Sequence, residues 1–86
     1  MAKRVAVVSI IVEDVSSVEA LNAILTQYRD GIIGRMGLPY KEKKVNIICV
    51  AVDAEENDIN AMTGKIGRLP GISAKTNYSN VKKTLC

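Results

Sequence analysis

Two apolar runs of eight residues decide the fold of this chain: VAVVSIIV at residues 5–12 and VNIICVAV at residues 45–52. Both runs are short and rich in β-branched residues, a composition that is typical of buried β-strands. They lie forty residues apart, with Val5 corresponding to Val45 and Val12 to Val52. The second half of the chain therefore repeats the pattern of the first half.

An amphipathic helix is expected after each run. After the first run, SSVE at residues 16–19 matches a capping box, in which a serine hydroxyl accepts a free backbone N–H and a glutamate reaches back. After the second run, Asn57 or Asp58 is a suitable N-cap. Gly31 and Gly71 stop the two helical patterns. The expected helices span residues 17–29 and 57–68, with apolar faces made by Val18, Leu21, Ile24, Leu25 and Tyr28 and by Ile59, Met62, Ile66 and Leu69.

A shorter strand is expected after each helix, and residues 38–44 form a polar connection between the halves. The order strand, helix, strand then occurs twice, which is the pattern of a ferredoxin-like α+β domain. Such a βαββαβ domain has an antiparallel four-stranded sheet with both helices on one face. The expected strands are residues 4–12, 32–37, 44–52 and 72–78, the expected domain is residues 1–78, and residues 79–86 form a C-terminal tail.

The composition excludes several kinds of chemistry. A net charge of +3 with three Tyr, no Phe and no Trp gives little support to nucleic-acid binding. The chain has no His and only two Cys, too few for a closed zinc or iron–sulfur site, so neither a metal nor a cofactor is expected. Cys49 lies in an apolar run and is expected to be a buried, inert thiol. The absence of a phosphate-binding loop, and of a Ser or Cys with a recognisable base, predicts that the protein is not an enzyme.

The longest apolar runs are too short to span a membrane, and acidic residues follow the first of them directly. No membrane contact and no signal peptide are therefore expected, and the cytoplasm is the expected location.

The two central strands are apolar on both faces, although the helices can cover only one face. We therefore expect a second subunit to cover the other face and form a dimer or tetramer. The assignment used here places Val8, Ile10, Ile48 and Val50 at that interface, with Arg35 on the edge strand. The alternation itself does not decide which set of residues is open, since a bulge would exchange the two sets.

Three motifs connect the chain to a known family: IIGRMGLPY at residues 32–40, VNII at 45–48 and TGKIGRLPG at 63–71. They resemble the small family of proposed iron-only hydrogenase system regulators, which are ACT-like domains similar to the ligand-binding domain of the nickel-responsive repressor. The resemblance covers about residues 5–78 and implies a ferredoxin-like fold, self-association and a regulatory role, including regulation of transcription. The repressor binds metal through His and Cys, and that site cannot be transferred to a chain without His. All 86 residues are used by the domain and its tail, so no direct contact with nucleic acid is expected.

The resemblance also suggests where an effector binds. ACT domains often follow their first strand with an acidic residue that contacts the ligand, and Glu13 and Asp14 match this pattern, with Ser16 close to the position where a Gly is usual. Arg35 and Tyr40 complete the expected effector site. The alternative interpretation is that the two acids favour the dipole of the following helix, that Arg35 is simply exposed and that Tyr40 covers the edge of the core.

Two functions remain open. The first is a small oligomeric regulatory domain that binds a small effector or a protein partner and is linked to iron-only hydrogenase regulation. The alternative is a ligand-free structural or assembly factor for a metalloenzyme system. In either case Gly64 and Gly67 are expected to let their helix approach the sheet closely.

Overall fold

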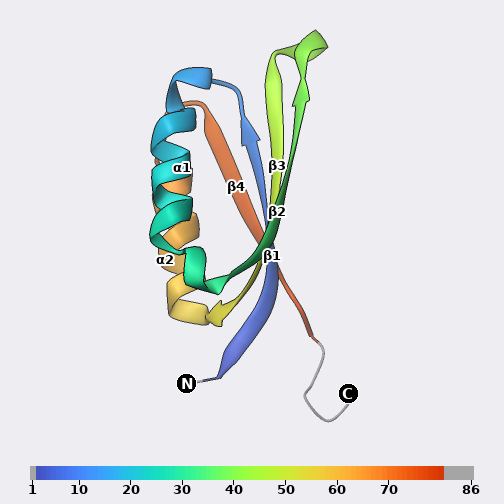
Figure 1. Cartoon of the computed structure of the whole chain (residues 1–86). Helices are drawn as coiled ribbons and strands as arrows, with labels where there is room; N and C mark the ends of the chain where they lie inside the picture. The colour runs from blue at the N-terminus through green and yellow to red at the C-terminus, as the bar shows by residue number, and fades with distance from the viewer. Residues whose placement is uncertain (1, 81–86) are drawn as a thin grey trace.

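The computed structural model describes residues 2–80, and these form the ferredoxin-like βαββαβ domain that the sequence predicts. The four strands make one antiparallel sheet in the order β2-β3-β1-β4. Both helices lie on the same face of this sheet, and the other face has no covering layer (Figure 1). The principal elements are β1 (Lys3–Val12), α1 (Val18–Gln27), β2 (Ile32–Tyr40), β3 (Val45–Glu55), α2 (Glu56–Gly67) and β4 (Ile72–Tyr78), joined by 3-10 turns η1 (Val15–Ser17), η2 (Arg29–Gly31) and η3 (Lys41–Lys43). Residues 81–86 of the expected tail lie outside the described part of the chain.

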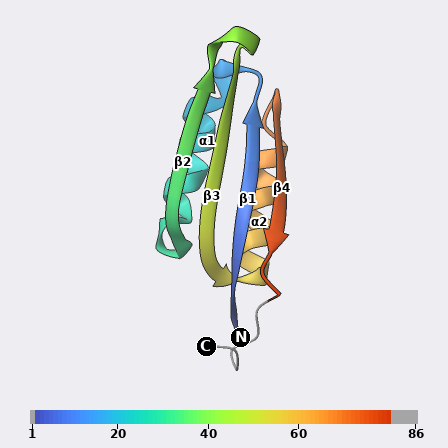
Figure 2. The same ribbon diagram turned by 90° about the vertical axis from the view of Figure 1, so that its right-hand side faces the viewer.

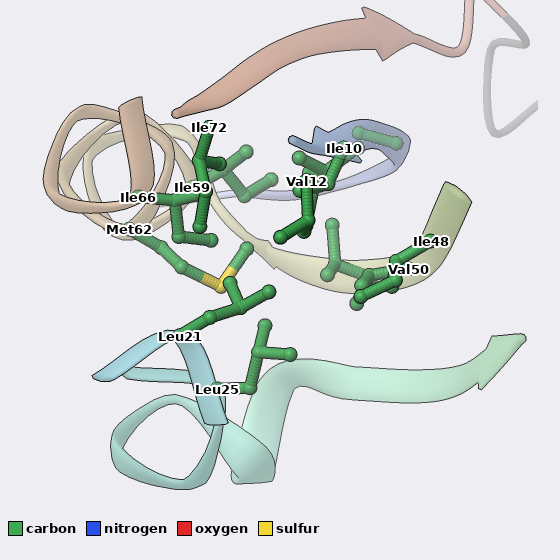
Figure 3. Packing of buried hydrophobic residues seen from close by; sticks show 13 residues of the cluster. Ile10, Val12, Leu21, Leu25, Ile48, Val50, Ile59, Met62, Ile66 and Ile72 are labelled. Atoms are coloured by element: carbon green, nitrogen blue, oxygen red, sulfur yellow. The ribbon is translucent and has the colours of Figure 1, made fainter. Parts of the chain in front are cut away.

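The core lies between the helices and the even-numbered residues of the two central strands. Ile10 and Val50 are completely buried, as is Leu21 of α1. Met62 of α2 fills the space between the two helices and the sheet, as Figure 3 shows. The full set of buried apolar residues is Ala6, Val8, Ile10, Val12, Leu21, Leu25, Ile48, Val50, Val52, Ile59, Met62, Ile66 and Ile72.

The assignment of Val8, Ile10, Ile48 and Val50 to a subunit interface is therefore wrong. These side chains face the helices, and none of them is more than 7% exposed. The odd-numbered residues of β1 and β3 form the open face instead, because successive side chains of a strand point to opposite faces. Cys49 belongs to this odd-numbered set and is partly exposed, in contrast to the buried thiol that was expected.

The open face carries a continuous apolar surface over three neighbouring strands. The register aligns Ile11 with Ile47 and Ile47 with Leu38, so that these side chains lie in one row across the sheet. We call this surface the apolar stripe; its large members, each between 38% and 56% exposed, are Val5, Val7, Ile11, Met36, Leu38 and Ile47.

The β2–β3 hairpin is longer than the sequence indicates. β2 continues to Tyr40 and β3 to Glu55, each three residues past the expected ends at residues 37 and 52. The prediction that residues 38–40 belong to a polar connection is therefore wrong. Pro39 suggested an end to the strand, but proline is tolerated here because β2 is an edge strand. The tip of this hairpin extends beyond the helices at one end of the molecule (Figures 1 and 2).

Neither the expected capping box of the first helix nor the expected N-cap of the second is formed. Ser17 precedes α1 but makes no side-chain cap; its hydroxyl donates to the carbonyl oxygen of Pro70 at 2.7 Å. Asp14 caps the η1 turn instead. Helix α2 begins at Glu56 after Glu55, so that Asn57 and Asp58 lie inside its first turn.

Only some of the glycines are required by the packing of this chain. A Cβ atom on Gly67 would meet no atom within 4 Å, and one on Gly64 would meet only the Nη1 atom of Arg68, at 3.7 Å. The expected close approach of α2 to the sheet at these two glycines is therefore wrong. Gly71 does have a structural reason, since its φ is +69° and an added Cβ would collide with the side chain of Asp14.

Candidate functional site

An open hollow of about 580 Å³ lies where the end of β1 meets the tip of the β2–β3 hairpin. The two regions come together because β1 and β3 are antiparallel, with Val12 opposite Asn46. The C-terminal end of β1 and the N-terminal end of β3 must then share one edge of the molecule. The lining residues are Glu13, Asp14, Val15, Pro39, Tyr40, Lys41, Lys44, Val45 and Asn46.

The acidic wall of the hollow is fixed by backbone contacts with the start of β4. The N–H of Glu13 donates to the carbonyl oxygen of Gly71 at 2.7 Å. The carboxylate of Asp14 accepts two hydrogen bonds from Ser16, one from its hydroxyl at 2.6 Å and one from its N–H at 3.0 Å. These hydrogen bonds stabilise the charged carboxylate and hold the pKa of Asp14 below its ordinary value. Asp14 is therefore ionised at neutral pH and oriented by the turn that it caps.

The basic wall comes from the hairpin tip. Lys41 and Lys44 flank the η3 turn, and the N–H of Lys44 closes the turn by donating to the Lys41 carbonyl at 3.2 Å. Lys44 has a left-handed backbone with φ of 56°, a conformation that is uncommon for a residue other than Gly. This bend returns the chain into β3 and leaves both lysines beside the hollow.

The floor between the two walls is mostly apolar. Tyr40 and Val45 are opposite each other in the hairpin, and Pro39 and Val15 line the hollow beside them. A lining that combines carboxylates, ammonium groups and apolar side chains is complementary to a small molecule that carries both an amine and a carboxylate. The nine lining residues include no nucleophile paired with a base.

The structure brings together three of the five residues predicted for effector binding. Glu13, Asp14 and Tyr40 line the hollow. Ser16 is not among the lining residues and acts on the site through Asp14. Arg35 is separate, since its Nη2 atom donates to Oδ1 of Asn22 on α1 at 3.1 Å and so lies on the helix side of the sheet. The prediction of Arg35 as part of this site is wrong.

Sequence reasoning missed the two lysines. Lys41 and Lys44 were assigned to a polar connection, although the antiparallel pairing of the central strands carries this connection to the end of β1. The available signal was the forty-residue repeat, because it predicts a ferredoxin-like fold. In that fold the two central strands are antiparallel, so the end of the first strand meets the start of the third.

A second hollow, of about 440 Å³, lies at the opposite end of the molecule. Its rim is acidic, with Asp30, Asp53, Glu55 and Asp58, and Met62 is among its apolar lining residues. Among residues 2–80, no group of three or more His, Cys, Asp or Glu side chains is arranged to hold a metal ion. None of the helices in the same range is long and apolar enough to cross a membrane.

The order βαββαβ, with an antiparallel sheet β2-β3-β1-β4 and both helices on one face, defines a ferredoxin-like, ACT-like domain. The model of the TM1266-like family, described as "Iron-only hydrogenase system regulator, putative", matches residues 4–76. The chain therefore belongs to this family, as its motifs predicted.

Solved structures agree with this assignment. The uncharacterised protein TM1266 from Thermotoga maritima is 27% identical, with a TM-score of 0.85 over 88% of this chain and 96% of that chain. The C-terminal domain of the MgtC protein from Mycobacterium tuberculosis has a TM-score of 0.72 at 9% identity, over 95% of both chains. A formyltetrahydrofolate deformylase from Pseudomonas putida KT2440 has a TM-score of 0.64 at 8% identity, over 91% of this chain and 30% of that chain. The last two share the fold alone. No curated protein matched the sequence.

Proposed function

We propose that this protein is a non-catalytic regulatory domain that binds a small zwitterionic effector in the hollow at the end of β1 and associates with itself through the open face of its sheet. The regulated process would be an iron-only hydrogenase system, as the family description suggests. The observation that carries the proposal is that Glu13 and Asp14 line the same hollow as Lys41 and Lys44, together with apolar side chains. Such a lining fits a free amino acid or a similar small zwitterion.

The apolar stripe supports the second part of the proposal. Side chains such as Ile11 and Met36 are about half exposed in a single chain. Covering the rest of each side chain gains roughly 1 kcal/mol, so the six members together give several kcal/mol towards association. A contiguous surface of this kind is a common mark of an interface.

The effector is tested by following the thermal unfolding of the full chain with a panel of amino acids and related zwitterions at millimolar concentration. A binding compound should raise the melting temperature in proportion to the logarithm of its concentration above Kd. The increase should be lost in Lys44→Met and Glu13→Gln, which remove one charge from each wall.

Lys65→Met and Glu19→Gln are matched controls, because these residues lie on the two helices and outside the hollow. They should leave the increase unchanged. If no zwitterion stabilises the protein, effector binding at this hollow is excluded, and the ligand-free assembly factor becomes the better explanation of the fold.

A further inference from the structure

We infer that the open face is covered by a second copy of this chain, whose strands run antiparallel to those of the first. The twofold axis of this dimer lies in the plane between the two sheets and runs perpendicular to the strands. This inference rests on the self-association proposed above and adds its geometry. It follows from two asymmetries of the open face, one across the strands and one along them.

Across the strands, the open face is apolar on one side and polar on the other. The apolar stripe covers β2, β3 and β1, three strands that lie side by side in the sheet (Figure 2). On β4 the residues in the same rows are polar, with Ser73 beside Ile11, Lys75 beside Ser9 and Asn77 beside Val7. A twofold axis perpendicular to the strands places each strand over its own copy, so that the whole stripe meets the stripe of the second copy. Lys75, at the rim, can extend into solvent.

Along the strands, the open face has two columns, the β2–β3 hairpin and strand β1. Each column carries opposite charges at its two ends. In the β2–β3 column the hairpin tip bears Lys41 and Lys44, and the other end of β3 bears Asp53 and Glu55. In the β1 column the order is reversed, with Lys3 at the start of the strand and Glu13 just after its end. An axis perpendicular to the strands exchanges the two ends and brings unlike charges together in both columns.

An axis parallel to the strands cannot satisfy both conditions. If it passes between β3 and β1, it pairs unlike charges but lays Met36 and Leu38 of β2 over the polar residues of β4. If it is moved to β3 in order to cover the stripe, it stacks the lysines of the hairpin tip on one another and Asp53 on its own copy. Only the perpendicular axis matches apolar surface with apolar surface and acid with base.

The size of the face is adequate for such a dimer. Four strands of about nine residues give a surface of roughly 30 Å by 20 Å. Its accessible area approaches the roughly 800 Å² that each partner contributes to a standard interface.

Charge exchange tests the orientation, with the dimer dissociation constant of the full chain measured by sedimentation equilibrium. Lys44→Glu and Asp53→Lys should each weaken the dimer roughly tenfold, because each places like charges together at both ends of the symmetric interface. The double variant should return the constant to within about threefold of the original value. Asp30→Lys is the matched control, since this exposed acid lies in η2, the turn after α1, at the same end of the molecule as Asp53, and it should have no effect.

The alternatives give distinct results. A monomeric wild-type protein overturns both the inference and the proposed self-association. A dimer in which the exchange of Lys44 with Asp53 does not restore affinity overturns the orientation alone. If the dissociation constant is restored instead by the double variant of Lys44→Glu and Glu13→Lys, the twofold axis is parallel to the strands and lies between β3 and β1. Circular dichroism of each variant confirms that a loss of affinity does not come from unfolding.

Discussion

The helix-covered face and the open face of the sheet are built from similar residues but have opposite environments. On β1, Val8 and Ile10 are completely buried under the helices, while Val7 and Ile11 on the other side are 38% and 44% exposed. An apolar side chain that faces a helix layer of the same chain stabilises the fold directly. The same side chain on the open face has no such partner within one chain, and in the dimer proposed above it would contribute to association instead. Two adjacent positions of one strand thus differ in whether their side chains are buried within the chain or left at its surface.

The largest expected difference between the two faces is in the free energy of unfolding. Ile10→Ala removes a side chain from the closed core and should lower stability by about 2–5 kcal/mol. Ile11→Ala removes the same atoms from the open face and should cost about 1 kcal/mol or less. Urea titration at a concentration where the protein is monomeric measures both values. Equal losses for the two variants would contradict the assignment of the faces.

A smaller effect is expected when a charge is placed on the open face. Val7→Asp puts a carboxylate in the middle of the apolar stripe, so association should weaken by at least tenfold while the fold is retained. Lys75→Asp also places a carboxylate on the open face, in a neighbouring row but on the polar strand β4, and should change association by less than threefold. Light scattering across a concentration series compares the two variants. An equal response to both would show that the stripe is not the interface.

The choice between the two faces also marks the limit of what could be predicted from the sequence. Composition, period and the forty-residue repeat were sufficient for the element order and the sheet. They did not show which of the two alternating sets of side chains faces the helices, because both sets are rich in Val and Ile. Polar residues did not resolve this, since Ser9 and Asp53 belong to the odd-numbered, open set, whereas Asn46 belongs to the even-numbered set.

The candidate site was predicted in part for a similar reason. Glu13, Asp14 and Tyr40 were found because the resemblance identifies the end of the first strand. Arg35 was misplaced because it pairs with Val50 in the middle of the sheet and its side chain reaches Asn22 of α1, whereas the hollow lies at the hairpin tip. Lysines in a turn carry no pattern of their own, and their role depends on the strand pairing that places the turn.

The smallest expected effect concerns the acidic wall where the open face ends. The pKa of Asp14 is lowered in the folded protein by its hydrogen bonds from Ser16. A carboxyl group with a lowered pKa stabilises the fold at a pH above its unfolded value of 3.8, and this contribution is lost as the pH falls through the folded value. Asp14→Asn, which does not titrate, should therefore be slightly less stable than the wild type at pH 7, and the difference should become smaller at pH 2.5. Ser16→Ala should lose less stability than the wild type when the pH is lowered from 7 to 2.5. The reason is that it removes the hydroxyl that makes the 2.6 Å hydrogen bond to Asp14 and leaves only the backbone N–H. Urea titrations at the two pH values measure the effect in all three proteins. A stability difference between wild type and Asp14→Asn that does not change with pH would show that the carboxylate is not held by this turn.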